Sequence, residues 1–313
     1  MVNTKQKYRS FGVEEMESFE QNCILCEKTT YNNFYDLNPY SLIKCSSCGL
    51  IRVSPMPNSQ EKKKYNQSIY SSTEYRERYF KDKRFFTRWF KAKFKIIERL
   101  KPEKGKILDV GCSYGFFLEV AKRRGWDIYG IEINPITGGY AKDKFGDKIF
   151  IGELENSHFE MHCFDVITLW DVIEHVVNPV DFLKTVKNYL KPSGIICIQT
   201  PNIESYISKL KNKNWDWLTP GDHLYFFSPR TLLKTLKLVG LKSIYFNTWE
   251  PNCYFIDSLI GFKEINNILF ELYRKTIVRV FRKLLFFAFI PFQWILSGKN
   301  KGALIVTFSA IRD

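Results

Sequence analysis

The central part of the chain changes from a strand-like to a helix-like hydrophobic pattern at a turn of small residues. In residues 105–126 an apolar run ends at Asp109, small residues interrupt it, and a helical pattern follows. This order describes the first strand, loop and helix of a nucleotide-binding α/β sheet. Strand-like and helix-like segments alternate through residues 103–250, and residues 302–313 are apolar and β-branched. The pattern predicts an α/β core with a closing strand at 302–313.

Residues 60–102 form a basic, aromatic segment that we predict to be a helical bridge. Apolar residues follow helical spacing at Tyr75, Tyr79, Phe85, Phe86, Trp89, Phe90, Phe94, Ile97 and Leu100, and Pro102 closes the segment. The interleaved Lys and Arg residues are typical either of an RNA-binding surface with stacking aromatics or of a buried stripe with a solvated basic face. The second arrangement is the commoner. We therefore expect one helix that covers the entrance of the nucleotide site.

Residues 251–301 are apolar and basic, and two interpretations of them stay open. Seven Lys or Arg residues and no acid occur between Arg274 and Lys301. The apolar stretch from Leu284 to Leu296 is 13 residues long, contains Pro291 and is too short to span a bilayer. We expect a helical lid inserted before the last strand, packed over an acceptor pocket. The alternative is peripheral membrane contact through residues 274–301, with basic flanks on the lipid headgroups.

The overall composition is that of a globular protein with a large core. The chain has 313 residues, 45% of them hydrophobic and 26% charged, and a net charge of +14. This charge suits anionic partners such as nucleic acid, phosphorylated metabolites or an acidic membrane, and it equally suits general solubility. The first 20 residues lack an apolar signal core, so we expect a cytoplasmic protein, in which peripheral attachment at the inner face of the membrane would follow from residues 274–301.

Four cysteines near the N-terminus have the spacing of a zinc site. Two Cys-x-x-Cys pairs, Cys23 with Cys26 and Cys45 with Cys48, are separated by 18 residues. Two such turns can direct four sulfurs at one tetrahedral ion, and a segment this small has little core of its own. We predict a zinc-binding head over residues 20–56. Four thiolates leave no open coordination position, so the zinc would be structural.

The turn after Asp109 argues against a dinucleotide. Counting from Gly111, the third and sixth positions are Ser113 and Phe116, so the Gly-x-Gly-x-x-Gly pattern fails. An acid at the strand end would repel a pyrophosphate, whereas it suits a ligand with a positive amino group. S-adenosylmethionine is such a ligand. The stretch "LDVGCSYG" resembles "LDVGCGxG", the first motif of the class I S-adenosylmethionine-dependent methyltransferases, with Ser113 in place of the middle glycine.

The resemblance continues through three further elements of that family. It implies a Rossmann-like, seven-stranded sheet with an antiparallel last strand, and an S-adenosylmethionine-binding core at residues 103–250. The strand "WDIYGIEINP" ends at an acid that can accept the ribose hydroxyls, "KIFIGELEN" is similar to the adenine loop, and "FDVITLWDVIEHVVNP" supplies the cofactor's rim. The implied cofactor-binding residues are Asp109, Gly111, Cys112, Ser113, Gly115, Glu132, Ile133, Glu153, Leu154, Trp170 and Asp171.

Histidines are the candidates for moving the acceptor's proton. His223 is the better base candidate, because the adjacent Asp222 can orient it and Tyr225 is close in sequence. His175 also follows a strand near the cofactor edge, although such a residue more often has a structural role at a helix start.

The layout resembles a narrower group, the zinc-containing sugar C-methyltransferases of bacterial sugar and secondary-metabolite pathways. In that group an acid–His pair at this point of the chain is catalytic, and Asp222 and His223 match it, with Asp for the usual Glu. The resemblance departs at the closing strand, after which we expect no counterpart of the further nucleotide-sugar-binding domain of those enzymes. The resemblance covers roughly residues 20–250 and implies a small-molecule acceptor such as a sugar or glycan precursor, methylated at C or O.

Three other functions compete with this one. An RNA methyltransferase could use the zinc head and the bridge to bind RNA, but "LWDVIEH" stands where base amino-methylating enzymes tend to have an Asn/Asp-Pro-Pro-aromatic motif, so the sequence argues against nucleic acid. A lipid-linked acceptor would fit membrane contact. A zinc-ribbon adaptor without catalysis would not need Asp109 and Glu132.

Overall fold

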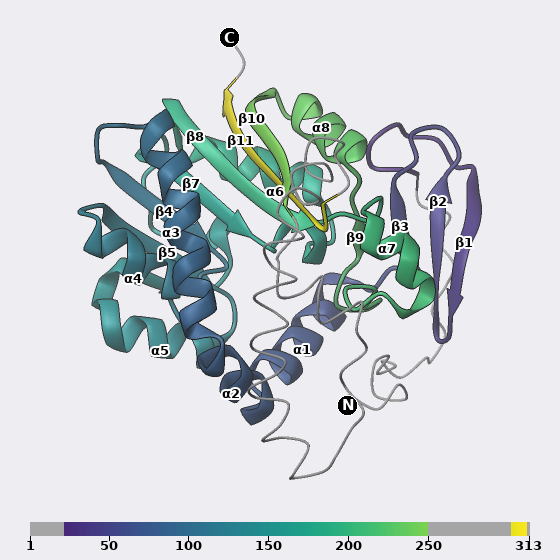
Figure 1. Cartoon of the computed structure of the whole chain (residues 1–313), viewed down its shortest axis with the longest axis horizontal. Coiled ribbons are helices and arrows are strands. Elements are labelled where there is room, and N and C mark those ends of the chain that lie inside the picture. Colours follow the sequence, from purple (N-terminus) through teal and green to yellow (C-terminus); the bar gives the residue numbers. More distant parts are fainter. Residues whose placement is uncertain (1–21, 250–301, 312–313) are drawn as a thin grey trace, which may run out of the picture.

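One mixed sheet forms the core of the residues that the computed structural model describes, 22–249 and 302–311. Its seven strands have the order β10-β11-β8-β7-β4-β5-β6 (Figure 1). In chain order they are β4 (Lys106–Val110), β5 (Asp127–Glu132), β6 (Ile149–Ile151), β7 (Phe164–Trp170), β8 (Leu190–Pro201), β10 (Leu241–Trp249) and β11 (Leu304–Ile311). β4 pairs in parallel with β5 and β7, whereas β11 is antiparallel to β8 and β10. The predicted α/β fold with an antiparallel closing strand is confirmed.

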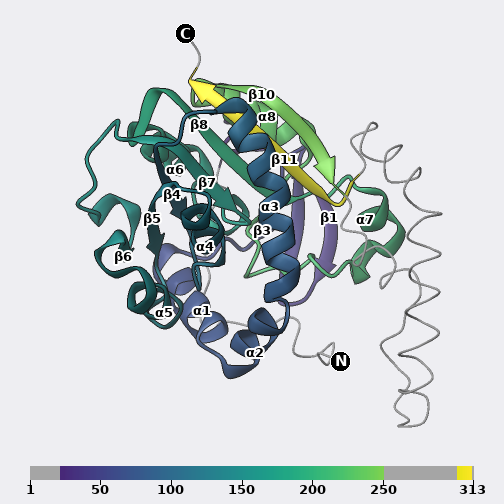
Figure 2. The same cartoon turned by 60° about the vertical axis from the view of Figure 1, so that its left-hand side comes forward.

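Helices cover both faces of this sheet, and Figure 2 shows α3 crossing one of them. The helices after the bridge are α4 (Phe116–Arg123), α5 (Pro135–Phe145), α6 (Pro179–Asn188), α7 (Tyr206–Lys211) and α8 (Pro229–Leu238). Short 3-10 helices are η2 (Gly146–Lys148), η3 (Leu154–Asn156), η4 (Ile173–His175) and η5 (Asn212–Asn214). Successive residues of β4 point to opposite faces. Ile107 therefore packs in one hydrophobic cluster with α3 and α4, and Leu108 in another with α6 and α8.

The bridge consists of three helices, so the prediction of one continuous helix was wrong. They are α1 (Ser59–Tyr70), α2 (Thr73–Lys81) and α3 (Lys83–Leu100). The side chain of Ser72 accepts a hydrogen bond from the backbone N–H of Tyr75 and starts α2, and a further break follows at Asp82. A side-chain cap of this kind ends the continuity that hydrophobic spacing suggests. The aromatic stripe itself is buried in α3, at Trp89, Phe90 and Phe94.

A second, four-stranded sheet joins the cysteine-containing head to the core. It contains β1 (Tyr31–Leu37), β2 (Tyr40–Cys45) and β3 (Ile51–Ser54), and its fourth strand, β9 (Tyr225–Phe226), comes from the core segment after Asp222. β3 and β9 are antiparallel with Ile51 opposite Phe226, and the N–H of Val53 donates to the carbonyl of Leu224 at 3.0 Å. The head therefore shares backbone hydrogen bonds with the segment that carries Asp222 and His223.

No helix within residues 22–249 and 302–311 is long and apolar enough to cross a membrane. The predicted lid at 251–301, together with the predicted membrane contact at 274–301, lies outside the described residues.

Candidate active site

The turn after β4 brings backbone close to two neighbouring side chains. Gly111 has φ +79°, and a Cβ there would lie 2.7 Å from Val172 Cγ2. Gly115 has φ +71°, and a Cβ there would lie 2.7 Å from the Phe145 ring. Both positions require glycine because the left-handed backbone and the close approach exclude a side chain. Ser113 also adopts a left-handed conformation, with φ 48°, so the departure from the family motif keeps the shape of the turn.

Two buried carboxyl groups end the adjacent strands β4 and β5. Glu132 accepts hydrogen bonds from the backbone N–H of Ser113 at 2.7 Å and of Asn134 at 2.9 Å, which fixes its orientation at the turn. Asp109 accepts one from the Thr168 hydroxyl at 2.6 Å. Burial raises the pKa of Asp109 to about 8, against the lowering effect of that hydrogen bond. A cation beside Asp109 would restore its charge, because an opposite charge favours the ionised form.

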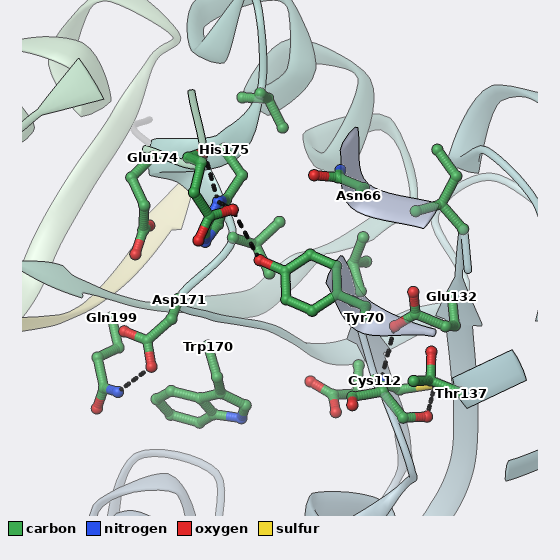
Figure 3. Close-up of a pocket in the computed structure, with 18 of the residues that line it drawn as sticks. Asn66, Tyr70, Cys112, Glu132, Thr137, Trp170, Asp171, Glu174, His175 and Gln199 are labelled. Carbon is green, nitrogen blue, oxygen red and sulfur yellow. Dashed lines mark hydrogen bonds and ion pairs between the residues drawn. The ribbon is translucent and has the colours of Figure 1, made fainter. Parts of the chain in front are cut away.

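These carboxyl groups open into one cavity of about 1450 Å³. Of the predicted site residues, those that line it are Asp109, Gly111, Cys112, Ser113, Glu132, Ile133, Glu153, Leu154, Trp170, Asp171, His175, Asp222 and His223. Gly115 does not line it, since it begins α4 behind the turn. Figure 3 shows Glu132, Cys112 and Thr137 at one end of the cavity, and Glu174, His175 and Gln199 at the other. Tyr70 and Trp170 lie between the two ends.

At the second end, Asp222 is held by three side chains. The Nδ1 of His175 lies 2.9 Å from the Asp222 carbonyl and 3.1 Å from its Oδ1. The hydroxyl of Tyr70 donates to the same Oδ1 at 2.9 Å, and Lys62 Nζ lies 3.4 Å from it. Burial opposes the charge on His175, but the Asp222 carboxylate outweighs burial and raises the His175 pKa. The charges of His175 and Lys62 in turn hold the pKa of Asp222 well below its usual value, despite burial.

Asp222 does not orient His223, contrary to the sequence-based prediction. The Nδ1 of His223 donates to the carbonyl of Trp217 at 2.8 Å, and its ring lies edge-on to that of His175, 4.7 Å between centroids. The backbone N–H groups of Asp222 and His223 both donate to the Thr219 carbonyl, and the two side chains have different hydrogen-bond partners, His175 and the Trp217 carbonyl. Burial, together with the charge of His175, lowers the pKa of His223 to about 3. His223 is therefore neutral at physiological pH.

Tyr225 lies away from the cavity, contrary to its predicted place beside the base. It belongs to β9, is buried, and donates its hydroxyl hydrogen bond to the carbonyl of Val177 at 2.9 Å. Pairing with β3 places this strand in the sheet of the head, where Tyr225 packs in the same hydrophobic cluster as Cys23 and Cys48. Tyr225 is a residue of the core and contributes no group to the site.

The four cysteines of the head converge. Four sulfur atoms all lie within 4.8 Å of one another, those of Cys23, Cys26, Cys45 and Cys48. The Cys23 and Cys48 sulfurs are 3.4 Å apart, and the Cys26 and Cys45 sulfurs are 3.5 Å apart. These separations are too long for disulfides, whose sulfurs lie about 2.05 Å apart. Four sulfurs around one centre are the donor set that tetrahedral zinc prefers. The residues present therefore fit a structural zinc ion.

Comparison with known proteins identifies the family. Residues 75–245 match the methyltransferase domain family. The chain belongs to this family. It is similar to the mitochondrial ubiquinone biosynthesis O-methyltransferase of Schizosaccharomyces pombe, with 33% identity over 102 residues, 30% of this chain and 37% of the relative. It is also similar to the ubiquinone biosynthesis O-methyltransferase of Aliivibrio fischeri, with 29% identity over 149 residues, 44% of this chain and 64% of the relative. The methyltransferase thus spans between about a third and two thirds of the length of these relatives.

Solved structures share the fold of this methyltransferase. A phosphoethanolamine N-methyltransferase 2 from Haemonchus contortus superposes with a TM-score of 0.52 at 14% identity, covering 84% of this chain and 62% of that one. An S-adenosylmethionine-dependent methyltransferase from Thermotoga maritima gives 0.50 at 20% identity, covering 78% and 98%. Together with the family match, the Rossmann-like sheet identifies an S-adenosylmethionine-dependent methyltransferase.

Sequence reasoning missed four residues of the site. Lys62 and Tyr70 come from α1 and reach Asp222 across about half the chain, so no local pattern pointed to them. Gln199, at the end of β8, donates to Asp171 at 2.9 Å. Glu174 stands directly before His175 in η4, and its carboxyl group is buried at the second end of the cavity. Only Glu174 had a usable signal, because "IEH" places an acid and a histidine together after a strand.

Proposed function

We propose that this methyltransferase transfers the methyl group of S-adenosylmethionine to a hydroxyl group of a small molecule, with His175 as the base. The observation that carries the proposal is the His175–Asp222 hydrogen bond inside the cavity that also contains Asp109 and Glu132. O-methyl transfer is supported by the similarity to ubiquinone biosynthesis O-methyltransferases. A sugar or glycan precursor, as the sequence suggests, stays a prediction within this class of acceptors.

The end of the cavity at β4 and β5 suits the nucleoside. Both oxygens of Glu132 already accept a backbone hydrogen bond, and their remaining lone pairs are free to accept the ribose hydroxyls. Asp109 supplies a carboxyl group for the amino acid part of the ligand, whose positive charge would offset the cost of ionising Asp109 in a buried place. Bound there, S-adenosylmethionine supplies an already activated methyl group.

The other end suits proton removal from the acceptor. Asp222 holds the Nδ1 of His175, so the Nε2 of the neutral ring is left to accept a proton from a hydroxyl group. The negative charge of Asp222 then stabilises the imidazolium that forms. His223 is a poorer base, because its pKa is lowered to about 3, mainly by burial. We therefore assign the base to His175 and not to His223.

Single substitutions of the two histidines test this assignment. His175→Ala should keep its affinity for S-adenosylhomocysteine within threefold and lose about 10²- to 10⁴-fold of the methyl-transfer rate, which is the usual contribution of a general base. The assay measures label transfer from radiolabelled S-adenosylmethionine to a panel of phenols, diols and sugar nucleotides, with the methylated atom assigned by NMR. A fully active His175→Ala enzyme would remove His175 as the base.

We further propose that the head binds one zinc ion through Cys23, Cys26, Cys45 and Cys48. The convergence of four sulfurs supports this, and the head has few other means of fixing its two cysteine turns. The ion would hold these turns beside the sheet that contains β9, and so it would act on folding and not on the methyl-transfer step.

A further inference from the structure

Glu174 presents an unpaired polar group at the acceptor end of the cavity. Its side chain lines the cavity and is 1% exposed, and neither carboxyl oxygen makes a hydrogen bond of ordinary geometry among the described residues. A weak interaction with the Thr200 hydroxyl lowers the pKa of Glu174 without pairing the carboxyl group. Leaving a buried polar group unpaired is unfavourable, because the group gives up its hydrogen bonds to water and gains none in return. A ligand that hydrogen-bonds to Glu174 removes this cost without any further desolvation of the carboxyl group, so the position favours a ligand with a polar group of its own.

Glu174 shares this place with two imidazole rings. One oxygen of Glu174 and one ring nitrogen each of His175 and His223 all lie within 4.8 Å of one another. Three atoms this close fit on or inside a circle with a radius of about 2.8 Å, which is the length of a hydrogen bond. One small polar group among them can therefore reach more than one of the three side chains. Figure 3 shows Glu174 and His175 at the same end of the cavity.

The hydrogen-bonding roles of these groups are set by their surroundings. The Nδ1 of His223 donates to the carbonyl of Trp217, so the Nε2 of this neutral ring can only accept. Burial raises the pKa of Glu174 to about 8, against the lowering effect of the charge on His175. Burial therefore favours the protonated carboxyl group, which can donate. The cavity presents one donor and one acceptor side by side.

We propose that Glu174 and His223 bind a second hydroxyl group of the acceptor, adjacent to the hydroxyl group that His175 deprotonates. A hydroxyl is the group that completes both bonds, since its oxygen accepts from Glu174 while its proton is donated to His223. A carbonyl would leave His223 unpaired, and an ether would do the same. The acceptor class is then a compound with two neighbouring hydroxyl groups, aromatic or alicyclic. This inference rests on the proposed function, because it places the reacting hydroxyl at His175.

Matched pairs of ligands test the subsite in the complex with S-adenosylhomocysteine. Calorimetry compares catechol with phenol, and cis-cyclohexane-1,2-diol with cyclohexanol. We expect at least one diol to bind tenfold or more tightly than its monohydroxy partner. Glu174→Gln should keep that preference, because the amide still donates a hydrogen bond, and Glu174→Ala should lose it. Glu160→Gln, at an exposed acid outside the cavity, is the control and should keep it.

Three results would overturn the subsite. One is equal affinity within both ligand pairs in the unmodified enzyme, and another is an unchanged preference in Glu174→Ala. The third is a Mg²⁺ requirement that Glu174→Gln abolishes, because Glu174, His175 and His223 would then be ligands of a cation. Binding of S-adenosylhomocysteine, measured first in each variant, verifies that the protein is folded. Failure of the unmodified enzyme to bind it would count against the proposed function and not only against the subsite.

Discussion

Lys62 offers a sharp test of how the bridge supports the acceptor end. Its side chain is buried, and its Nζ donates to the carbonyl of Gly221 at 3.1 Å and to the carbonyl of Asp222. The same Nζ lies 3.4 Å from the Asp222 carboxylate. Lys62→Met keeps most of the length and packing of the side chain while removing the charge and all three contacts. The substitution therefore separates the charge and hydrogen bonds of Lys62 from the packing of its side chain.

The expected loss of stability follows from these contacts. Removing one partner of a buried ion pair costs about 3–5 kcal/mol. Asp222 keeps His175 and Tyr70 as partners, so we expect the lower end, about 3 kcal/mol of unfolding free energy. At about 2–4 °C per kcal/mol for a domain of this size, the Tm should fall by about 6–12 °C.

The same substitution should shift the pH dependence of turnover. The charge of Lys62 lowers the pKa of His175, opposing the raising effect of Asp222. Without Lys62 the His175 pKa rises. Because a base must be deprotonated to act, the ascending limb of kcat/KM against pH should move to higher pH.

Denaturant titration, thermal melts and pH–rate profiles measure these effects. Lys64→Met, on an exposed position of the same helix, should change neither stability nor the profile. Lys62→Arg keeps the charge and should restore much of both. A Lys62→Met enzyme with unchanged stability and an unshifted pH limb would refute the reasoning that Lys62 supports Asp222.

Two further predictions concern the nucleoside end and the head. Asp109→Ala should weaken S-adenosylmethionine binding at least tenfold in calorimetry, because it removes the cavity carboxyl group that we propose to face the ligand's amino group. Unchanged affinity would mean that the ligand binds elsewhere. Elemental analysis should find one zinc ion per chain, and Cys23→Ser or Cys48→Ser should give insoluble protein, since the head then lacks a ligand; a well-folded, metal-free preparation would exclude the zinc site.

The parts of the site that were predictable are those encoded in continuous segments. Asp109 and the glycine turn lie within one strand–turn–helix unit, and Glu132 ends the next strand, so spacing alone placed them at one edge of the sheet. The parallel order of the strands follows from the same local patterns, since alternating strands and helices leave few other arrangements.

The acceptor end depends on contacts between distant segments. The partner of Asp222 is His175, 47 residues away, whereas adjacency in sequence suggested His223. The side chains of Asp222 and His223 have different hydrogen-bond partners although the residues are adjacent. The N–H of Leu224 donates to the Glu174 carbonyl, and this contact between distant segments brings the His175 ring to the Asp222 carboxylate. The break between α1 and α2 was equally hidden, because hydrophobic spacing does not register a serine that caps a new helix.

Because β3 pairs with β9, the two ends of the cavity depend on the head to different degrees. The half that would hold the methyl donor lies at the ends of β4 and β5 in the large sheet, whereas the segment that carries Asp222 pairs on one side with residues 51–53 of the head. A change in the head that stops short of unfolding it, such as a substitution that weakens the pairing of β3 with β9, would therefore lower turnover before it weakens binding of the methyl donor.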